Sequence, residues 1–201
     1  SNTVSIKNGK QEITASAKNF IIATGSSSIE IPNIPVDEKQ IVSSTGALSL
    51  TKVPKSLLVI GGGYIGLEMG SVWSRLGSKV TVVEALDRIV PTMDGEIAKE
   101  FMKMLQKQGI EFKLSHKVSS AKSGKSGVDV EMATSDKKVI KENYEVVLMS
   151  VGRKPNTEGL GLEKIGVNLT DNKSIEIRDN FQTSVKGIFA IGDVAPGPML
   201  A

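Results

Sequence analysis

The sequence of 201 residues contains no cysteine and a single histidine, His116. Without cysteine, this chain has no disulfide framework, no thiolate zinc site and no cysteine nucleophile. One histidine excludes a multi-histidine metal centre, and a Ser–His–Asp triad would have to be built around that residue. Aromatic residues make up only 4% of the chain, which is sparse for a surface that stacks nucleobases.

Charge of one sign and long apolar runs are also scarce. The formal net charge is +3, and lysines alternate with acidic residues, as in Asp136-Lys137-Lys138, without forming a basic face. We therefore expect no nucleic-acid partner. The longest apolar runs, such as residues 56–60 and 146–149, have the length of strands, far below the ~20 residues that span a bilayer. We expect no membrane partner, and the first residues do not show the pattern of a signal peptide.

What is abundant is glycine, with 20 residues, and an alternation of strand and helix patterns. Residues 57–60, 79–84 and 110–114 are short β runs, and apolar residues recur at helical spacing between them. This alternation predicts an α/β fold with a Rossmann-like parallel sheet and right-handed crossovers. Between residues 118 and 141 the period shifts towards two, which predicts an antiparallel β-meander inserted before a buried strand at 146–149.

The same patterns predict which residues are buried. The second helical pattern has one apolar face, made of Ile97, Phe101, Met104 and Leu105, and methionines at such positions are typical of a core. Residues 20–23 and 188–191 are apolar throughout, as in strands buried on both faces. Near the start, Asn8-Gly9 between two alternating stretches predicts a β-hairpin.

The strand at 57–60 runs into Gly61-Gly62-Gly63-Tyr64-Ile65-Gly66, which matches the G-x-G-x-x-G fingerprint of dinucleotide-binding folds. The motif opens a predicted helix, and Glu84 ends the next strand at the spacing of a ribose-binding carboxylate. The three conditions together favour a dinucleotide site. The alternative is an ordinary glycine-rich turn before a core helix.

Each glycine of the motif has a physical reason. Gly61 permits a tight turn, and Gly63 carries no side chain that would block a pyrophosphate. The helix N-terminus then offers N–H groups and a partial positive charge to the phosphates. Gly66 and Gly70 lie on one helix face, and their cost in helix propensity predicts a close contact with the sheet.

Glu84 distinguishes between the two nicotinamide cofactors. A carboxylate accepts hydrogen bonds from the adenosine ribose hydroxyls of NAD and repels the 2′-phosphate of NADP. The next residue is Ala85, where an NADP-binding chain would supply arginine, although Arg88 is nearby. The residues therefore favour NAD. The alternative is a glutamate at a strand end without a ligand.

Four segments carry a resemblance to a known family. They read SSTGALSL at 43–50, VIGGGYIGLE at 59–68, LQKQG at 105–109 and VGRKPNTEGL at 151–160. The second segment is similar to the NAD segment of the flavoprotein pyridine nucleotide-disulfide oxidoreductases. The other three resemble the dihydrolipoamide dehydrogenases within that family, and the match runs essentially from end to end.

The resemblance implies an NAD site. Its pyrophosphate and nicotinamide side would be held by the stretch Gly61, Gly62, Gly63, Tyr64, Ile65, Gly66, Leu67 and Glu68. Glu68 would point towards the nicotinamide, Glu84 would take the adenine ribose, Val118 would pack on adenine and Gly152 would approach the nicotinamide end. From the residues alone, Glu68 as a solvated helix residue and Val118 as a core valine stay open.

The resemblance also implies part of an FAD site. Thr24, Gly25 and Ser26 would contact FAD, and Asp193, which follows Gly192, would bind the ribityl hydroxyls. Backbone groups at the end of the chain would meet the flavin, namely those of Met199, Leu200 and Ala201. From the residues alone, Asp193 as the cap of a turn stays open.

The resemblance implies a reaction that this chain carries only in part. In the family, a disulfide of two cysteines, a His–Glu pair of the partner subunit and FAD pass electrons from dihydrolipoamide to NAD. This sequence has no cysteine, no second glycine fingerprint and no initiator methionine. We therefore expect a piece of a longer enzyme, with partial FAD-domain segments at 1–45 and 157–201 and an NAD-binding domain at 46–156. The piece is expected to bind NAD, not to retain FAD, and not to catalyse.

Two other functions stay open: a stand-alone NAD-binding or NAD-sensing module, and a related flavin disulfide reductase with another substrate. Residues 44–50 and 154–160 favour dihydrolipoamide. For the whole enzyme the resemblance implies a homodimer that serves 2-oxo acid dehydrogenase or glycine cleavage complexes, in a bacterial cytoplasm or the mitochondrial matrix. For the piece itself we expect self-association through the apolar strands at 20–23 and 188–191.

Overall fold

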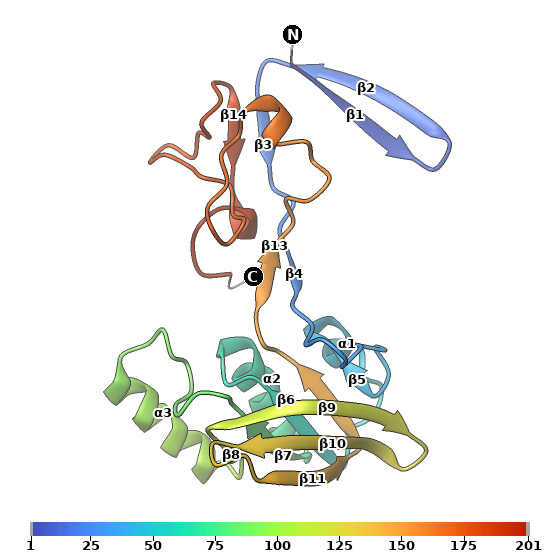
Figure 1. Ribbon diagram of the computed structural model, residues 1–201, viewed down its shortest axis with the longest axis vertical. Coiled ribbons are helices and arrows are strands. Elements are labelled where there is room, and N and C mark those ends of the chain that lie inside the picture. Colours follow the sequence, from blue (N-terminus) through green and yellow to red (C-terminus); the bar gives the residue numbers. More distant parts are fainter. Residues whose placement is uncertain (1, 200–201) are drawn as a thin grey trace. The chain divides into compact units, whose positions relative to one another are not determined.

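The computed structural model describes residues 2–199 of the chain (Figure 1). These residues form two compact units, one of residues 28–152 and one of residues 2–27 together with 153–199. The chain passes from one unit to the other after Ser27 and returns after Gly152. The NAD-binding domain predicted at residues 46–156 is defined by the cofactor it would bind, whereas the two units are defined by packing. The predicted limits therefore stay predictions.

The larger unit is built on a five-stranded parallel sheet with the order β5-β12-β6-β7-β8. Its strands are β5 (Ile41–Val42), β6 (Ser56–Ile60), β7 (Lys79–Val83), β8 (Glu111–Lys113) and β12 (Val146–Met149). In the three central strands nearly every residue is buried, because a parallel sheet of this kind is covered on both faces. The predicted Rossmann-like α/β fold is confirmed.

Helices connect the parallel strands. They are α1 (Ser44–Ser49), α2 (Tyr64–Arg75) and α3 (Gly95–Lys107). Helix α2 joins β6 to β7 and α3 joins β7 to β8, as the alternation of patterns predicts. Ser43 and Asp94 cap α1 and α3 by accepting hydrogen bonds from backbone N–H groups of the first turn. Helix α2 has no such capping side chain.

The apolar face predicted for α3 is only partly buried. Ala98 and Leu105 are each 2% exposed, whereas Ile97, Phe101 and Met104 are 57%, 37% and 59% exposed. The helix presents the sector of Ala98 and Leu105 to the core, and the neighbouring apolar sector therefore faces outward. For three of the four residues, the expected burial is wrong.

The predicted β-meander covers the face of the sheet opposite the helices. Its strands are β9 (His116–Gly124), β10 (Gly127–Thr134) and β11 (Val139–Tyr144), which pair antiparallel in the order β11-β10-β9. Alternate residues of β6 serve the two faces: Leu57 and Val59 belong to the core on the helix side, Leu58 and Ile60 to the core on the meander side. The period-two pattern is confirmed as an antiparallel insertion.

The smaller unit consists mainly of paired short strands and loops. The pairs are β1 (Asn2–Asn8) with β2 (Gln11–Ala17), β3 (Phe20–Ile22) with β14 (Ile188–Ala190), and β4 (Ser26–Ser28) with β13 (Arg153–Pro155). The first pair is the predicted hairpin, and β3 and β14 pair in parallel. Two short 3₁₀ helices, η1 (Glu163–Ile165) and η2 (Gly192–Val194), flank a small core. Among residues 2–199, no helix has the length and apolarity needed to cross a membrane.

Helix α2 approaches the sheet closely at Gly66. A Cβ atom at Gly66 would lie 2.4 Å from the Gly61 carbonyl oxygen and 2.5 Å from the Ser150 hydroxyl oxygen. A Cβ atom at Gly70, one turn further along the same face, would lie 3.4 Å from Cγ1 of Val80, an ordinary van der Waals distance. The predicted close contact is therefore present at Gly66, whereas Gly70 has room for a methyl group.

These two glycines form a matched pair of substitutions. Gly66→Ala is expected to destabilise the chain by about 2–3 kcal/mol, because the added methyl group must push the helix off the sheet. Gly70→Ala is expected to be neutral or to stabilise by up to about 1 kcal/mol, because alanine has the higher helix propensity. Equilibrium urea denaturation measures both changes, and equal destabilisation by the two substitutions would contradict the difference in packing.

Candidate functional site

The glycine turn lies between the end of β6 and the start of α2. Gly61 has a φ of +109°, and a Cβ atom there would lie 2.4 Å from the carbonyl oxygen of Ser150. Its N–H donates to the Val83 carbonyl oxygen at 2.8 Å. The turn therefore needs glycine at this position, both for the backbone conformation and for the close approach of β12.

The turn delivers the chain to an open helix N-terminus. Gly63 is the N-cap residue of α2, with no capping side chain, and nothing lies within 4 Å of the position its Cβ would occupy. Such a terminus attracts anions through its N–H groups and the helix dipole. The arrangement of Gly61 and Gly63 therefore suits a phosphate group that approaches the backbone directly.

Glu84 lies against the glycine turn. Its Oε2 accepts a hydrogen bond from the Gly62 N–H at 2.7 Å, and its Oε1 accepts one from the Leu86 N–H at 2.8 Å. The backbone thus holds the carboxylate at the carboxyl end of β7, beside the turn. A carboxylate has further lone pairs, so it can still accept hydrogen bonds from ligand hydroxyls.

Arg88, the cation that the sequence places near Glu84, is bound elsewhere. Its Nη2 donates to the carbonyl oxygen of Pro91 at 2.8 Å. The guanidinium therefore bonds to its own loop.

The other residues predicted for the NAD site differ in accessibility. Tyr64 and Glu68 are exposed on α2, whereas Leu67 is buried in the core. Val118 is 3% exposed and belongs to the core between sheet and meander, as the alternative of a core valine has it. Its strand β9 starts beside Glu84, because the His116 N–H donates to the Glu84 carbonyl oxygen at 3.0 Å.

Ile65 and Gly152 are the remaining residues of the larger unit that were predicted for the NAD site. Ile65 is half-buried within the first turn of α2. Gly152, at the end of the larger unit, has a φ of +130°, and its carbonyl oxygen accepts from the Ile29 N–H at 3.0 Å. Among the residues predicted for the NAD site, Glu84 is thus connected with the glycine turn by a side-chain hydrogen bond.

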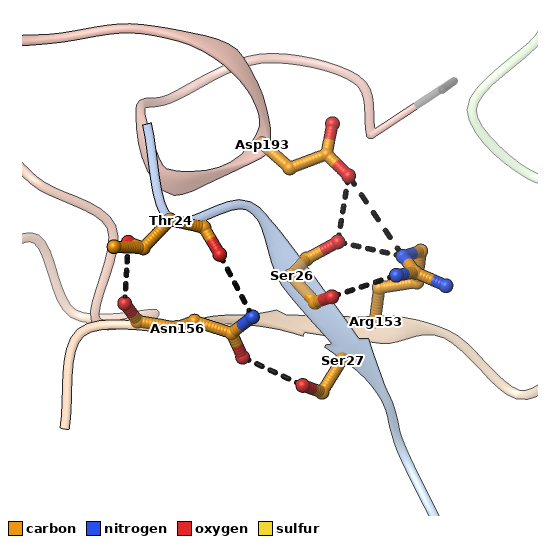
Figure 2. Close-up of polar contacts among 6 residues, drawn as sticks. All are labelled: Thr24, Ser26, Ser27, Arg153, Asn156 and Asp193. Carbon is orange, nitrogen blue, oxygen red and sulfur yellow. Dashed lines mark hydrogen bonds and ion pairs between the residues drawn. The ribbon is translucent and has the colours of Figure 1, made fainter. Parts of the chain in front are cut away.

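A second cluster of polar side chains lies in the smaller unit, where Figure 2 shows Ser26, Arg153 and Asp193 close together. The Ser26 hydroxyl donates to Oδ2 of Asp193 at 2.6 Å. Arg153 donates from Nε to the Ser26 hydroxyl oxygen at 2.6 Å and from Nη2 to the Ser26 carbonyl oxygen at 2.7 Å. The cluster brings together Ser26 and Asp193, which sequence reasoning placed in one FAD site, and adds Arg153.

Asn156 ties the neighbouring residues of this cluster together (Figure 2). Its side-chain amide donates to the Thr24 carbonyl oxygen at 3.0 Å and accepts from the Ser27 hydroxyl at 2.6 Å. The Thr24 hydroxyl in turn donates to the Asn156 carbonyl oxygen at 2.7 Å. The proton of the Thr24 hydroxyl is thus committed within the chain, while its oxygen can still accept a hydrogen bond.

Sequence reasoning missed Arg153 and Asn156 as site residues, although both lie in the segment at 151–160 that carries the resemblance. Gly25, with a φ of +69°, forms the turn between β3 and β4, and Met199 is half-buried. Leu200 and Ala201 lie outside the described residues. Within residues 2–199 there is no cluster of side chains suited to hold a metal ion.

Comparisons with known proteins identify the family of the chain. The family model described as pyridine nucleotide-disulphide oxidoreductase matches residues 1–201. The chain is 57% identical to dihydrolipoyl dehydrogenase 1, mitochondrial, of Arabidopsis thaliana, over 92% of this chain and 36% of the relative. It is 55% identical to leghemoglobin reductase of Vigna unguiculata, over 92% of this chain and 35% of the relative. The chain therefore spans little more than a third of the length of these relatives.

A solved structure supports the fold independently. The water-forming NADH oxidase from Lactobacillus brevis, bound to NADH, superposes with a TM-score of 0.81 at 25% identity, over 96% of this chain and 43% of that protein. The family model covers every residue, and relatives more than half identical cover 92% of the chain. The chain belongs to the pyridine nucleotide-disulphide oxidoreductase family.

Proposed function

We propose that residues 46–156 are the NAD-binding domain of a dihydrolipoyl dehydrogenase. The observation that carries the proposal is the Glu84 carboxylate bonded to the Gly62 N–H, beside the open helix N-terminus at Gly63. A helix N-terminus that can donate to a pyrophosphate and a carboxylate that can accept from a ribose thus lie together at the carboxyl ends of parallel strands, where such folds bind ligands. The family is FAD- and NAD-dependent.

The residues of the domain suit the parts of NAD in order. The N-terminus of α2 neutralises the pyrophosphate, and the absence of a side chain at Gly63 lets it approach. Glu84 accepts from the adenosine ribose hydroxyls, whereas Val118, which is 3% exposed, serves the core rather than the adenine. Glu68 and Gly152 serve the nicotinamide end. Bound NAD supplies the hydride acceptor, and these residues hold and orient it.

We infer that the smaller unit is part of an FAD domain, made of residues 1–45 and 157–201, as in the family resemblance. The support is the Asp193 carboxylate, held at one oxygen by Ser26, since a carboxylate suits the hydroxyls of a ribityl chain. In the longer enzyme, dihydrolipoamide would be oxidised through a redox disulfide and FAD, with hydride transfer to NAD. The relative named dihydrolipoyl dehydrogenase supports this substrate.

A second candidate is a related flavin reductase with another substrate. It is favoured by the relative named leghemoglobin reductase, which is 55% identical and close in identity to the dihydrolipoyl dehydrogenase. The longer enzyme is proposed to be a homodimer that serves 2-oxo acid dehydrogenase or glycine cleavage complexes. The mitochondrial relatives favour the mitochondrial matrix over a bacterial cytoplasm.

The cofactor assignment is tested by calorimetry on the 201-residue chain. NAD is expected to bind more tightly than NADP, and Glu84→Ala is expected to weaken NAD by about tenfold or more, because a charge-assisted hydrogen bond is lost. The control is Glu145→Ala, since Glu145 also accepts a backbone N–H, from Lys55 at 2.7 Å, but at the amino ends of the strands. Equal affinity of the unsubstituted chain for NAD and NADP would refute the assignment.

The expectation that this chain binds NAD but does not retain FAD gives a second test. The purified chain is expected to contain no flavin and to leave dihydrolipoamide unoxidised, because it has no cysteine to exchange with the dithiol. Absorbance near the flavin bands and NADH formation from NAD measure the two properties. A yellow preparation with a flavin spectrum would contradict the proposed division.

Self-association of the chain is the third expectation. Ile21 of β3 is 65% exposed and Ile191 beyond β14 is 41% exposed, which leaves apolar surface at a short sheet. Light scattering at increasing concentration is expected to show oligomers, and Ile21→Lys is expected to reduce them. Leu48→Lys, at a 74% exposed residue of α1, serves as the control. A monomer at all concentrations would count against this surface.

A further inference from the structure

The Asp193 carboxylate is anchored at only one of its two oxygens. Oδ2 accepts from the Ser26 hydroxyl at 2.6 Å and lies 3.8 Å from Nε of Arg153. Among residues 2–199, Oδ1 accepts no hydrogen bond and takes part in no ion pair. The side chain is 13% exposed, so an acceptor oxygen is left at a largely buried group, as a ligand hydroxyl requires.

The chemistry of each group fixes the direction of the hydrogen bonds that join Arg153, Ser26 and Asp193. A guanidinium can only donate and an ionised carboxylate can only accept. Because Nε of Arg153 donates to the Ser26 hydroxyl oxygen at 2.6 Å, the single Ser26 proton is directed to Asp193. The hydrogen bonds therefore run in a single direction, from Arg153 through the Ser26 hydroxyl to Asp193.

Arg153 also fixes Ser26 as a whole. Its Nη2 donates to the Ser26 carbonyl oxygen at 2.7 Å while Nε holds the hydroxyl. A planar fork of this kind holds the main chain and the side chain of one residue together, which a lysine ammonium cannot do in the same geometry. The Arg153 side chain is 22% exposed, so solvent screens these bonds only in part.

We propose that Arg153 and Ser26 are positioning residues that hold the Asp193 carboxylate in the orientation in which its second oxygen accepts a hydroxyl of the FAD ribityl chain. This inference rests on the proposed role of Asp193 towards FAD. It assigns the Ser26 side chain to Asp193 rather than to the cofactor, and it gives Arg153 a function without contact with the flavin.

The test is a double-mutant cycle in the full-length enzyme, prepared as apoprotein and titrated with FAD while flavin fluorescence reports binding. Asp193→Ala is expected to raise the FAD dissociation constant by about tenfold or more. Ser26→Ala and Arg153→Met are each expected to raise it by roughly three- to tenfold when Asp193 is present. In the Asp193→Ala background, each is expected to change it by less than about twofold, because their effect passes through the carboxylate.

Matched variants separate the possible outcomes. Arg178→Met, at an exposed arginine of the same unit, is the control and is expected to leave FAD affinity unchanged. Arg153→Lys is expected to restore little of the loss. If Arg153→Met does not fold, the cycle with Ser26→Ala decides, since it removes only a hydroxyl group.

Two results are unfavourable and differ from each other. If Ser26→Ala and Arg153→Met weaken FAD equally in both backgrounds, they contact the cofactor or act on the fold in general, and the positioning role is overturned. If Asp193→Ala leaves FAD affinity unchanged, the proposed role of Asp193 fails instead.

Discussion

The close approach of helix α2 to the parallel sheet at Gly66 is the constraint on which the proposed NAD site depends. The space for a side chain there is already filled by the Gly61 carbonyl oxygen and the Ser150 hydroxyl. Since the helix sits this low on the sheet, its first turn starts directly at the end of β6. The Gly62 N–H then meets the Glu84 carboxylate of the neighbouring strand at 2.7 Å. One packing contact thus sets the distance between the N-terminus of α2 and the Glu84 carboxylate.

The sequence predicts this part of the fold well because its signals are local. The buried runs of β6, β7 and β12, the glycine turn and the glutamate ending β7 are each visible within a short window. The face of α3 was harder to predict. Ile97, Phe101 and Met104 repeat at helical spacing, but periodicity identifies an apolar sector without telling which residues the core contacts. Ala98 and Leu105 occupy the core instead, because the tertiary packing of α3 decides the outcome.

The hydrogen-bonded cluster around Asp193, in contrast, could not be predicted from local sequence patterns. Ser26 and Arg153 are separated by 127 positions in the chain, and Ser26 and Asp193 by 167. No pattern within a window predicts that three such residues share one chain of hydrogen bonds. The family resemblance placed Ser26 and Asp193 in one site but did not include Arg153, which bonds to Ser26. The pairing of β4 with β13 brings Arg153 to Ser26.

The Glu84 and Asp193 carboxylates are held by different groups. This difference determines how far each proposed site depends on the rest of the protein. Glu84 is fixed by backbone N–H groups of Gly62 and Leu86, so its orientation depends on a contiguous stretch of one compact unit. Asp193 is fixed by the Ser26 side chain, and Ser26 is placed by the pairing of β4 with β13, two strands far apart in the sequence. A site of the first kind is complete once its own unit folds. A site of the second kind needs distant segments to meet, so we infer that NAD binding is the more separable of the two functions.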